Sequence, residues 1–134
     1  MSSDIREEMG RKKRVSTDTK GTIIIKRDGT IYKQQFKKLS SGETKLLGLI
    51  LKYMSTDTNH IILGGDTIKI IEKESAYNEK YILELASKLK RKHFLNYCKR
   101  FPREYIVNPT FATKGNEESI WQFIQTVEYQ CREE

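Results

Sequence analysis

The apolar positions of the chain fall into short groups whose spacing predicts both strands and helices. Residues 1–20 carry no periodic apolar face, so burial would not offset the entropy of ordering them, and a flexible basic arm is expected. Residues 22–36 hold two β-rich runs on either side of Asp28 and Gly29, a dipeptide that supplies the positive φ angles of a tight turn. The pattern therefore predicts a β-hairpin over 22–36.

The segment 40–55 predicts a helix at the centre of the core. Ser40 and Glu43 match a capping box, in which each side chain can bond to the backbone amide of the other residue. Apolar residues follow on nearly every face, and those at helical spacing are Leu46, Leu47, Ile50 and Met54. A helix that is apolar nearly all round belongs inside a small core.

A short strand and two helices are predicted next. The apolar run 60–63 suits a strand, and Gly64 with Gly65 favours a turn after it. Asp66 or Thr67 can cap a short helix in the segment that follows.

The second helix, over 79–92, has Asn78 as its predicted N-cap and carries one apolar stripe. The stripe consists of Ile82, Leu85, Ala86 and Leu89. The residues that project from the rest of the helix are Lys80, Tyr81, Glu84, Ser87, Lys88 and Arg91. This polar face is expected to remain outside the core.

A second hairpin is predicted from two strand-like runs, 94–99 and 104–108, whose turn contains Arg100, Pro102 and Arg103. Pro109 ends it, because proline restricts the preceding residue and cannot donate to a strand ladder.

The C-terminal segment 117–131 fits two interpretations. As a helix it places Ile120, Ile124, Val127 and Cys131 on one stripe, and as a strand it places Trp121 and Phe123 on one face. The helix is the favoured prediction.

This order of elements predicts an α+β winged helix-turn-helix domain over 21–134, preceded by the arm 1–20. An additional N-terminal hairpin and the C-terminal helix or strand would complete it. In a helix-turn-helix the second helix enters the major groove of DNA, where the base edges can be read. Here that helix is 79–92, and the hairpin after it would be the wing.

The charge distribution supports this assignment. The chain has a formal net charge of +7 and a sequence pI near 9.4, which favours an anionic partner such as nucleic acid. Residues 88–103 contain seven Lys or Arg and no acidic residue. A solvated helix face is the simpler interpretation of such a run, but this one continues from the helix into the predicted wing, where a docked domain meets phosphates.

Candidate contacts with DNA follow from this placement. The N-terminal half of the second helix is what reaches base edges, and the base-facing candidates are Asn78, Lys80, Tyr81, Glu84 and Ser87. The phosphate candidates are Lys88, Lys90, Arg91, Lys92, Lys99, Arg100 and Arg103. The basic cluster at 11–14 in the arm has no assigned contact.

Several segments resemble RepL-type plasmid replication proteins, a family of small winged-helix DNA-binding proteins. They are "GTIYKQQF", "KLLGLILKYM", "DTIKIIEKESAYNEKYILELASKLKRKHFL" and "YIVNPTFATKG", within residues 21–127. Only "VNP" followed by a Lys-Gly turn is a local signature. The resemblance implies binding at the origin of a plasmid or other mobile element, with replication initiation or copy control as the role.

No catalytic, metal or cofactor site is expected. The two cysteines, Cys98 and Cys131, lie far apart, and the two histidines, His60 and His93, form no metal-binding motif. A DNA nickase would need such a histidine pair beside its tyrosine, so we expect a protein that is not an enzyme. The chain shows neither a signal peptide nor a membrane-length apolar segment, which predicts a cytoplasmic protein with no membrane partner.

Two other functions stay open. A dimeric transcriptional regulator similar to the MarR type would use Ile120, Ile124 and Val127 as its dimer seam, unless this stripe closes the core of its own chain. A single-stranded nucleic-acid binder, or an interaction module among replication proteins, is the other alternative, because the fold does not decide between these roles.

Overall fold

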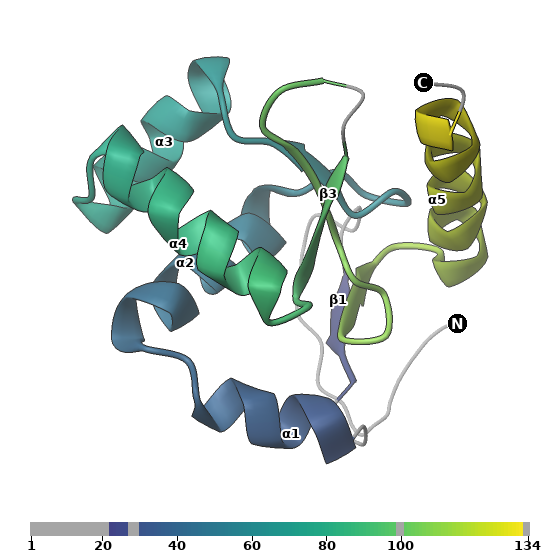
Figure 1. Ribbon diagram of the computed structural model, residues 1–134, viewed down its shortest axis with the longest axis horizontal. Coiled ribbons are helices and arrows are strands. Elements are labelled where there is room, and N and C mark those ends of the chain that lie inside the picture. Colours follow the sequence, from purple (N-terminus) through teal and green to yellow (C-terminus); the bar gives the residue numbers. More distant parts are fainter. Residues whose placement is uncertain (1–21, 27–29, 99–100, 133–134) are drawn as a thin grey trace.

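The computed structural model describes residues 22–26, 30–98 and 101–132, and these residues form five helices and two antiparallel sheets (Figure 1). The mixed α+β architecture agrees with the predicted class. A small sheet pairs β1 (Ile23–Ile25) with β5 (Ala112–Lys114), and a larger one has the strand order β2-β4-β3.

The predicted hairpin over 22–36 is wrong, because its two runs lie in different elements. The first run forms β1, whose partner is β5, and the second forms a helix, α1 (Thr30–Lys37). The phenyl ring of Phe36 in α1 packs on the rings of Phe94 and Phe111, with centroids 6.4 and 6.2 Å away. Lys and Gln in the run favour a helix, and this packing stabilises it. The predicted turn at Asp28 and Gly29 lies outside the described residues.

The central helix, α2 (Ser41–Tyr53), is confirmed together with its capping box. The Glu43 amide donates to Ser40 Oγ at 3.1 Å, and the Ser40 amide donates to a Glu43 carboxylate oxygen at 2.8 Å. The predicted apolar residues are buried in the main core, namely Leu46, Leu47, Ile50 and Met54.

Along the chain, two helices follow the first strand of the larger sheet and precede the second predicted hairpin. They are α3 (Gly65–Ser75) and α4 (Glu79–Arg91), and they follow β2 (His60–Ile62). Asn78 caps α4 as predicted, since its side chain accepts from the Tyr81 amide at 2.8 Å. The predicted stripe of α4 is buried in the main core, with Ile82, Leu85, Ala86 and Leu89 all inside.

The cap predicted for α3 is wrong. Gly64 occupies the N-cap position and makes no side-chain cap bond, and Asp66 lies inside the first turn. The turn itself is as predicted, because Gly65 has a φ of +54°, which glycine adopts without strain. Glycine thus lets the chain leave the sheet and enter the helix directly.

The second hairpin is confirmed as β3 (Leu95–Cys98) and β4 (Glu104–Val107), which pair in antiparallel register with Tyr97 opposite Tyr105. β4 is the middle strand of the larger sheet and also pairs with β2. Its side chains alternate, so Tyr105 and Val107 enter the main core while Ile106 belongs to a second cluster.

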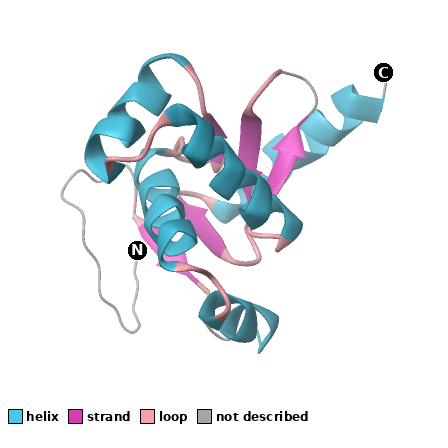
Figure 2. Ribbon diagram, turned by 60° about the vertical axis from the view of Figure 1, so that its left-hand side comes forward, coloured by secondary structure: helices cyan, strands magenta, loops and turns pink. Residues whose placement is uncertain are grey.

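The C-terminal segment is a helix, α5 (Glu117–Arg132), which covers the face of the larger sheet that lies away from the main core (Figures 1 and 2). Ile120, Ile124 and Val127 are buried in the second cluster with Cys98 and Ile106. The stripe therefore closes the core of its own chain, and its proposed use as a dimer seam is wrong. The side chain of Cys131 lies outside the described ones.

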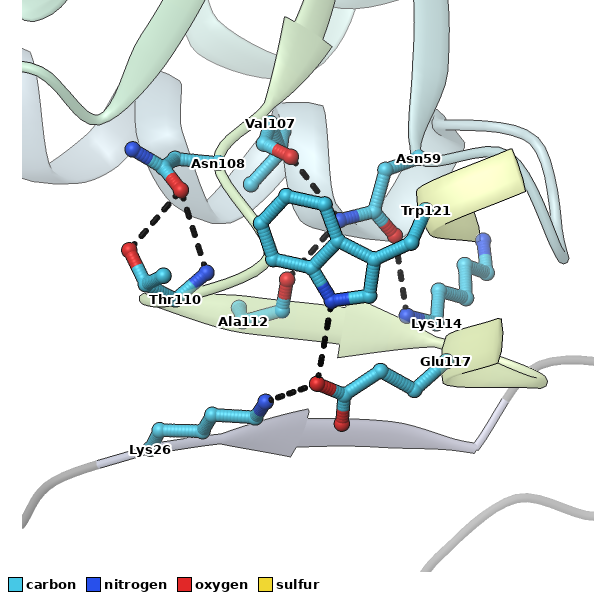
Figure 3. A network of polar contacts seen from close by, with 9 residues as sticks. All are labelled: Lys26, Asn59, Val107, Asn108, Thr110, Ala112, Lys114, Glu117 and Trp121. Atoms are coloured by element: carbon cyan, nitrogen blue, oxygen red, sulfur yellow. Dashed lines mark hydrogen bonds and ion pairs between the residues drawn. The ribbon is translucent and has the colours of Figure 1, made fainter. Parts of the chain in front are cut away.

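The buried side-chain amide of Asn59 joins β4 to β5, and Asn108 lies close to it (Figure 3). Asn59 is fully buried, and its amide nitrogen donates to the carbonyl oxygens of Val107 and Ala112 at 2.9 and 2.8 Å. Its carbonyl oxygen accepts from the Lys114 amide at 3.0 Å. Asn108 accepts from the amide and the hydroxyl of Thr110 at 3.1 and 2.8 Å. The "VNP" segment therefore has a structural part in closing the chain back on the core.

Candidate nucleic-acid interface

The polar face of α4 lies outside the core, opposite its buried stripe. Lys80, Glu84, Ser87 and Arg91 recur at helical spacing along the centre of this face. Lys80, Glu84 and Arg91 are exposed, and Ser87 is half-buried and accepts from the Arg91 guanidinium at 3.3 Å. The fold thus presents four predicted DNA contacts side by side on one accessible helix.

Two of the predicted base-facing residues also have structural partners. The side-chain oxygen of Asn78 is the cap of α4 and accepts from the backbone amide of Tyr81. The Tyr81 ring meets the Tyr77 ring edge to face, with centroids 4.8 Å apart. Its hydroxyl lies so close to Gly42 of α2 that a Cβ there would approach it to 2.9 Å. Both residues therefore help to fix the start of α4 against its neighbours.

The β3–β4 hairpin lies along one side of the α4 face. Arg103 donates to the Glu79 carboxylate at 2.6 Å, which ties the hairpin to the first turn of α4. The Lys90 ammonium lies 5.5 Å from the centre of the Tyr97 ring, a cation–π contact between α4 and β3. Both cations were predicted phosphate contacts, and both lie on the hairpin side. Lys99 and Arg100, predicted for the same role, lie outside the described residues.

The junction of α1 and α2 lies along the other side of the α4 face. The Lys92 ammonium donates to the buried carboxylate of Glu43 at 2.8 Å and reaches the Lys38 carbonyl oxygen at 3.4 Å. Burial raises the pKa of the Glu43 carboxyl, but the hydrogen bonds from Lys92 and from the Ser40 amide and the charge of Lys92 outweigh this effect. The pKa is therefore lower than usual, and Glu43 is ionised at neutral pH.

A pocket of about 410 Å³ opens at this junction. It is lined by Lys38, Ser40, Glu43, Lys88, Arg91 and Lys92. Three of its cations come from the predicted phosphate set, but Lys38 was missed. No local pattern could have identified it, because Lys38 lies 50 residues before Lys88 and joins the pocket only through the packing of α2 on α4.

We also searched the described part of the chain for a metal site and for a membrane-spanning helix. It contains no group of three or more His, Cys, Asp or Glu residues that could hold a metal ion. The His60 ring nitrogen Nε2 hydrogen-bonds to the buried carboxylate of Glu104 beneath α5. Among the described helices, none combines the length and the apolar character needed to cross a bilayer.

Comparisons of the chain with models of protein families, with curated protein sequences and with solved structures find no match. The likeness to RepL-type proteins therefore stays a prediction from the sequence. Function has to follow from the residues and from their geometry.

Proposed function

We propose that the protein binds double-stranded DNA as a winged helix, with α4 in the major groove and the β3–β4 hairpin as the wing. The observation that carries the proposal is the connectivity. The order α2-β2-α3-α4-β3-β4 with the strand order β2-β4-β3 is the order expected of a winged helix-turn-helix, and it supports this proposal. This arrangement leaves the polar face of α4 exposed between the hairpin and the α1–α2 junction, which suits the second helix of such a pair.

The two halves of α4 would have different tasks. Lys80 and Glu84 are exposed near its N-terminal end, and they suit base edges because lysine donates to guanine and glutamate accepts from cytosine. Lys88, Lys90 and Arg91 follow in the last turns and suit phosphates, which fix position and supply affinity without reading sequence. Specificity would therefore come from the first half and affinity from the second.

The biological role proposed is replication initiation or copy control on a plasmid or other mobile element. It is supported by the resemblance of the sequence to RepL-type proteins. The protein would act by binding its site and recruiting or excluding other proteins there.

Selection of binding sites from random duplex DNA tests the proposal most directly. We expect the full chain to enrich one preferred sequence. The variants Lys80→Ala and Glu84→Ala should then change the base preference at one or two positions, each by about 1–3 kcal/mol of discrimination. Equal losses on every sequence would remove these residues from the base-facing set, and no enrichment at all would contradict specific binding.

One observation favours a second candidate, the binding of single-stranded nucleic acid. Tyr97 and Phe101 in the hairpin region are 43% and 51% exposed, and Lys90 lies beside Tyr97. Exposed aromatic rings next to cations are surfaces on which unpaired bases stack. Competition of a labelled duplex by single strands of the same length separates the two candidates. A single-strand binder would release the labelled duplex at a lower concentration of single strands than of unlabelled duplex.

A further inference from the structure

The pocket between the α1–α2 junction and the last turns of α4 has the properties of a phosphate site. Four of its six lining residues are cations, and one is a carboxylate, Glu43. That carboxylate is already paired with Lys92 and with the Ser40 amide. The charge of the pocket therefore comes mainly from Lys38, Lys88 and Arg91.

The side chains of Lys38 and Lys88 are both exposed. Among the described residues, neither ammonium group makes a hydrogen bond or an ion pair, although Lys92 approaches the backbone carbonyl of Lys38. Within the described ranges Arg91 donates to Ser87 alone, at 3.3 Å, which leaves guanidinium donors available. The pocket also adjoins the N-terminal end of α2, where the helix dipole favours an anion.

We propose that this pocket holds one backbone phosphate of the bound duplex, with Lys38, Lys88 and Arg91 as its ligands. The inference rests on the proposed function and extends it. It adds Lys38, from outside the helix pair, to the DNA contacts and places a contact on the side of α4 away from the hairpin. The duplex would then be held on both sides of α4, with its bases over the centre of the helix.

The number of phosphates gives a quantitative test. Each phosphate that a protein neutralises contributes about 0.9 to the slope of log binding constant against log salt concentration. If Lys38 and Lys88 share one phosphate, the double variant Lys38→Ala/Lys88→Ala should flatten the slope for random duplex by about 1. Contacts with two separate phosphates would flatten it by about 2.

Two further double variants make this test specific. Lys38→Arg/Lys88→Arg keeps both charges and should keep the wild-type slope. Lys26→Ala/Lys52→Ala also removes two positive charges, but from exposed ion pairs outside the pocket. It should change the slope by less than the pocket variant does. A slope change near 0 or near 2 in Lys38→Ala/Lys88→Ala would overturn the single-phosphate pocket, while duplex binding by the wild type would still support the proposed function.

Chemical-shift mapping separates failure of the pocket from failure of the function. On adding duplex, the backbone amides of Ser41, Gly42, Lys88 and Arg91 should shift in the wild type and shift less in Lys38→Ala/Lys88→Ala. If the wild type shows no duplex binding, the proposed function fails and inorganic phosphate becomes the probe. Saturable shifts of the same amides by phosphate, lost in the double variant, would then support a pocket for free phosphate groups, and unchanged spectra would overturn it.

Discussion

Two buried carboxylates, those of Glu43 and Glu104, hold different regions of the molecule together by different means. Glu43 is 2% exposed and pairs with Lys92, so it joins α2 to the end of α4 beside the basic pocket. Glu104 is fully buried and pairs with His60, so it joins β4 to β2 under α5. Each ion pair or hydrogen bond crosses between segments that lie more than 40 residues apart in the chain.

The two regions differ in how deeply the carboxylate is buried and in what surrounds it and its partner. Glu43 also accepts from the Ser40 amide at 2.8 Å, a bond within its own capping box. Glu104 lies deeper, and the ring of its partner His60 also packs edge to face on Phe123 of α5, with centroids 5.5 Å apart. Losing one partner of a buried polar pair costs more where the pair is more deeply buried, so the His60 region should be the more sensitive of the two.

His60→Leu should give the largest effect. It removes a hydrogen bond from a fully buried carboxylate while keeping an apolar side chain against Phe123, and we expect the free energy of unfolding to fall by about 3 kcal/mol. Urea denaturation of the full chain measures this. The control is His60→Leu/Glu104→Leu, which removes both polar partners and should recover most of the loss, because an apolar pair often replaces a buried polar pair without cost.

If the double variant were as unstable as His60→Leu, lost packing, and not the lost hydrogen bond to the Glu104 carboxylate, would be responsible. The two regions would then differ in the packing of their side chains and not in how their carboxylates are held.

Lys92→Met should have a smaller effect. The methionine keeps the apolar stem of the side chain, and Glu43 keeps its bond to the Ser40 amide, so we expect a loss of about 1–2 kcal/mol. The same urea titration measures it. A loss as large as that of His60→Leu would show that the capping box does not compensate for Lys92, and the proposed difference between the regions would disappear.

The pH dependence of stability should give the smallest and most selective effect. The pKa of Glu43 is lowered from its ordinary value of 4.5, so below this value the unfolded state takes up the proton first and stability falls as pH decreases further. Glu43→Gln should make this decline shallower. Part of it should persist, because hydrogen bonds from Tyr53 and Lys52 lower the pKa of Glu74 as well. If the wild type and Glu43→Gln lost stability with the same slope below pH 4.5, the assignment to Glu43 would be contradicted.

The sequence allowed α2 and α4 and their buried faces to be predicted because periodicity and capping are local. The stripe that includes Ile82 and Leu89 and the capping box of Ser40 depend on residues only a few positions apart. The β3–β4 hairpin was also predicted, since its strands follow one another. In each case the signal and the structure span the same short segment.

Features that depend on distant segments could not be predicted in this way. β1 pairs with β5, almost 90 residues later, and no pattern near β1 indicates that partner. Phe36 stabilises a helix in a run that resembles a strand because Phe94 and Phe111 meet it from elsewhere in the chain. The pairing of Lys92 with Glu43 likewise depends on how α4 packs against α2. The predicted phosphate set therefore included a lysine that already holds a carboxylate.

β4 contributes to both hydrophobic clusters at once, and this has a consequence for how the protein opens. Its four residues are buried, and it is hydrogen-bonded on both edges, to β2 and to β3. Moving α5 away would uncover Ile106, and opening the α2–α4 side would uncover Tyr105 and Val107. The larger sheet therefore couples local fluctuations on its two faces, so that the helices on either side belong to one cooperative unfolding unit rather than to two.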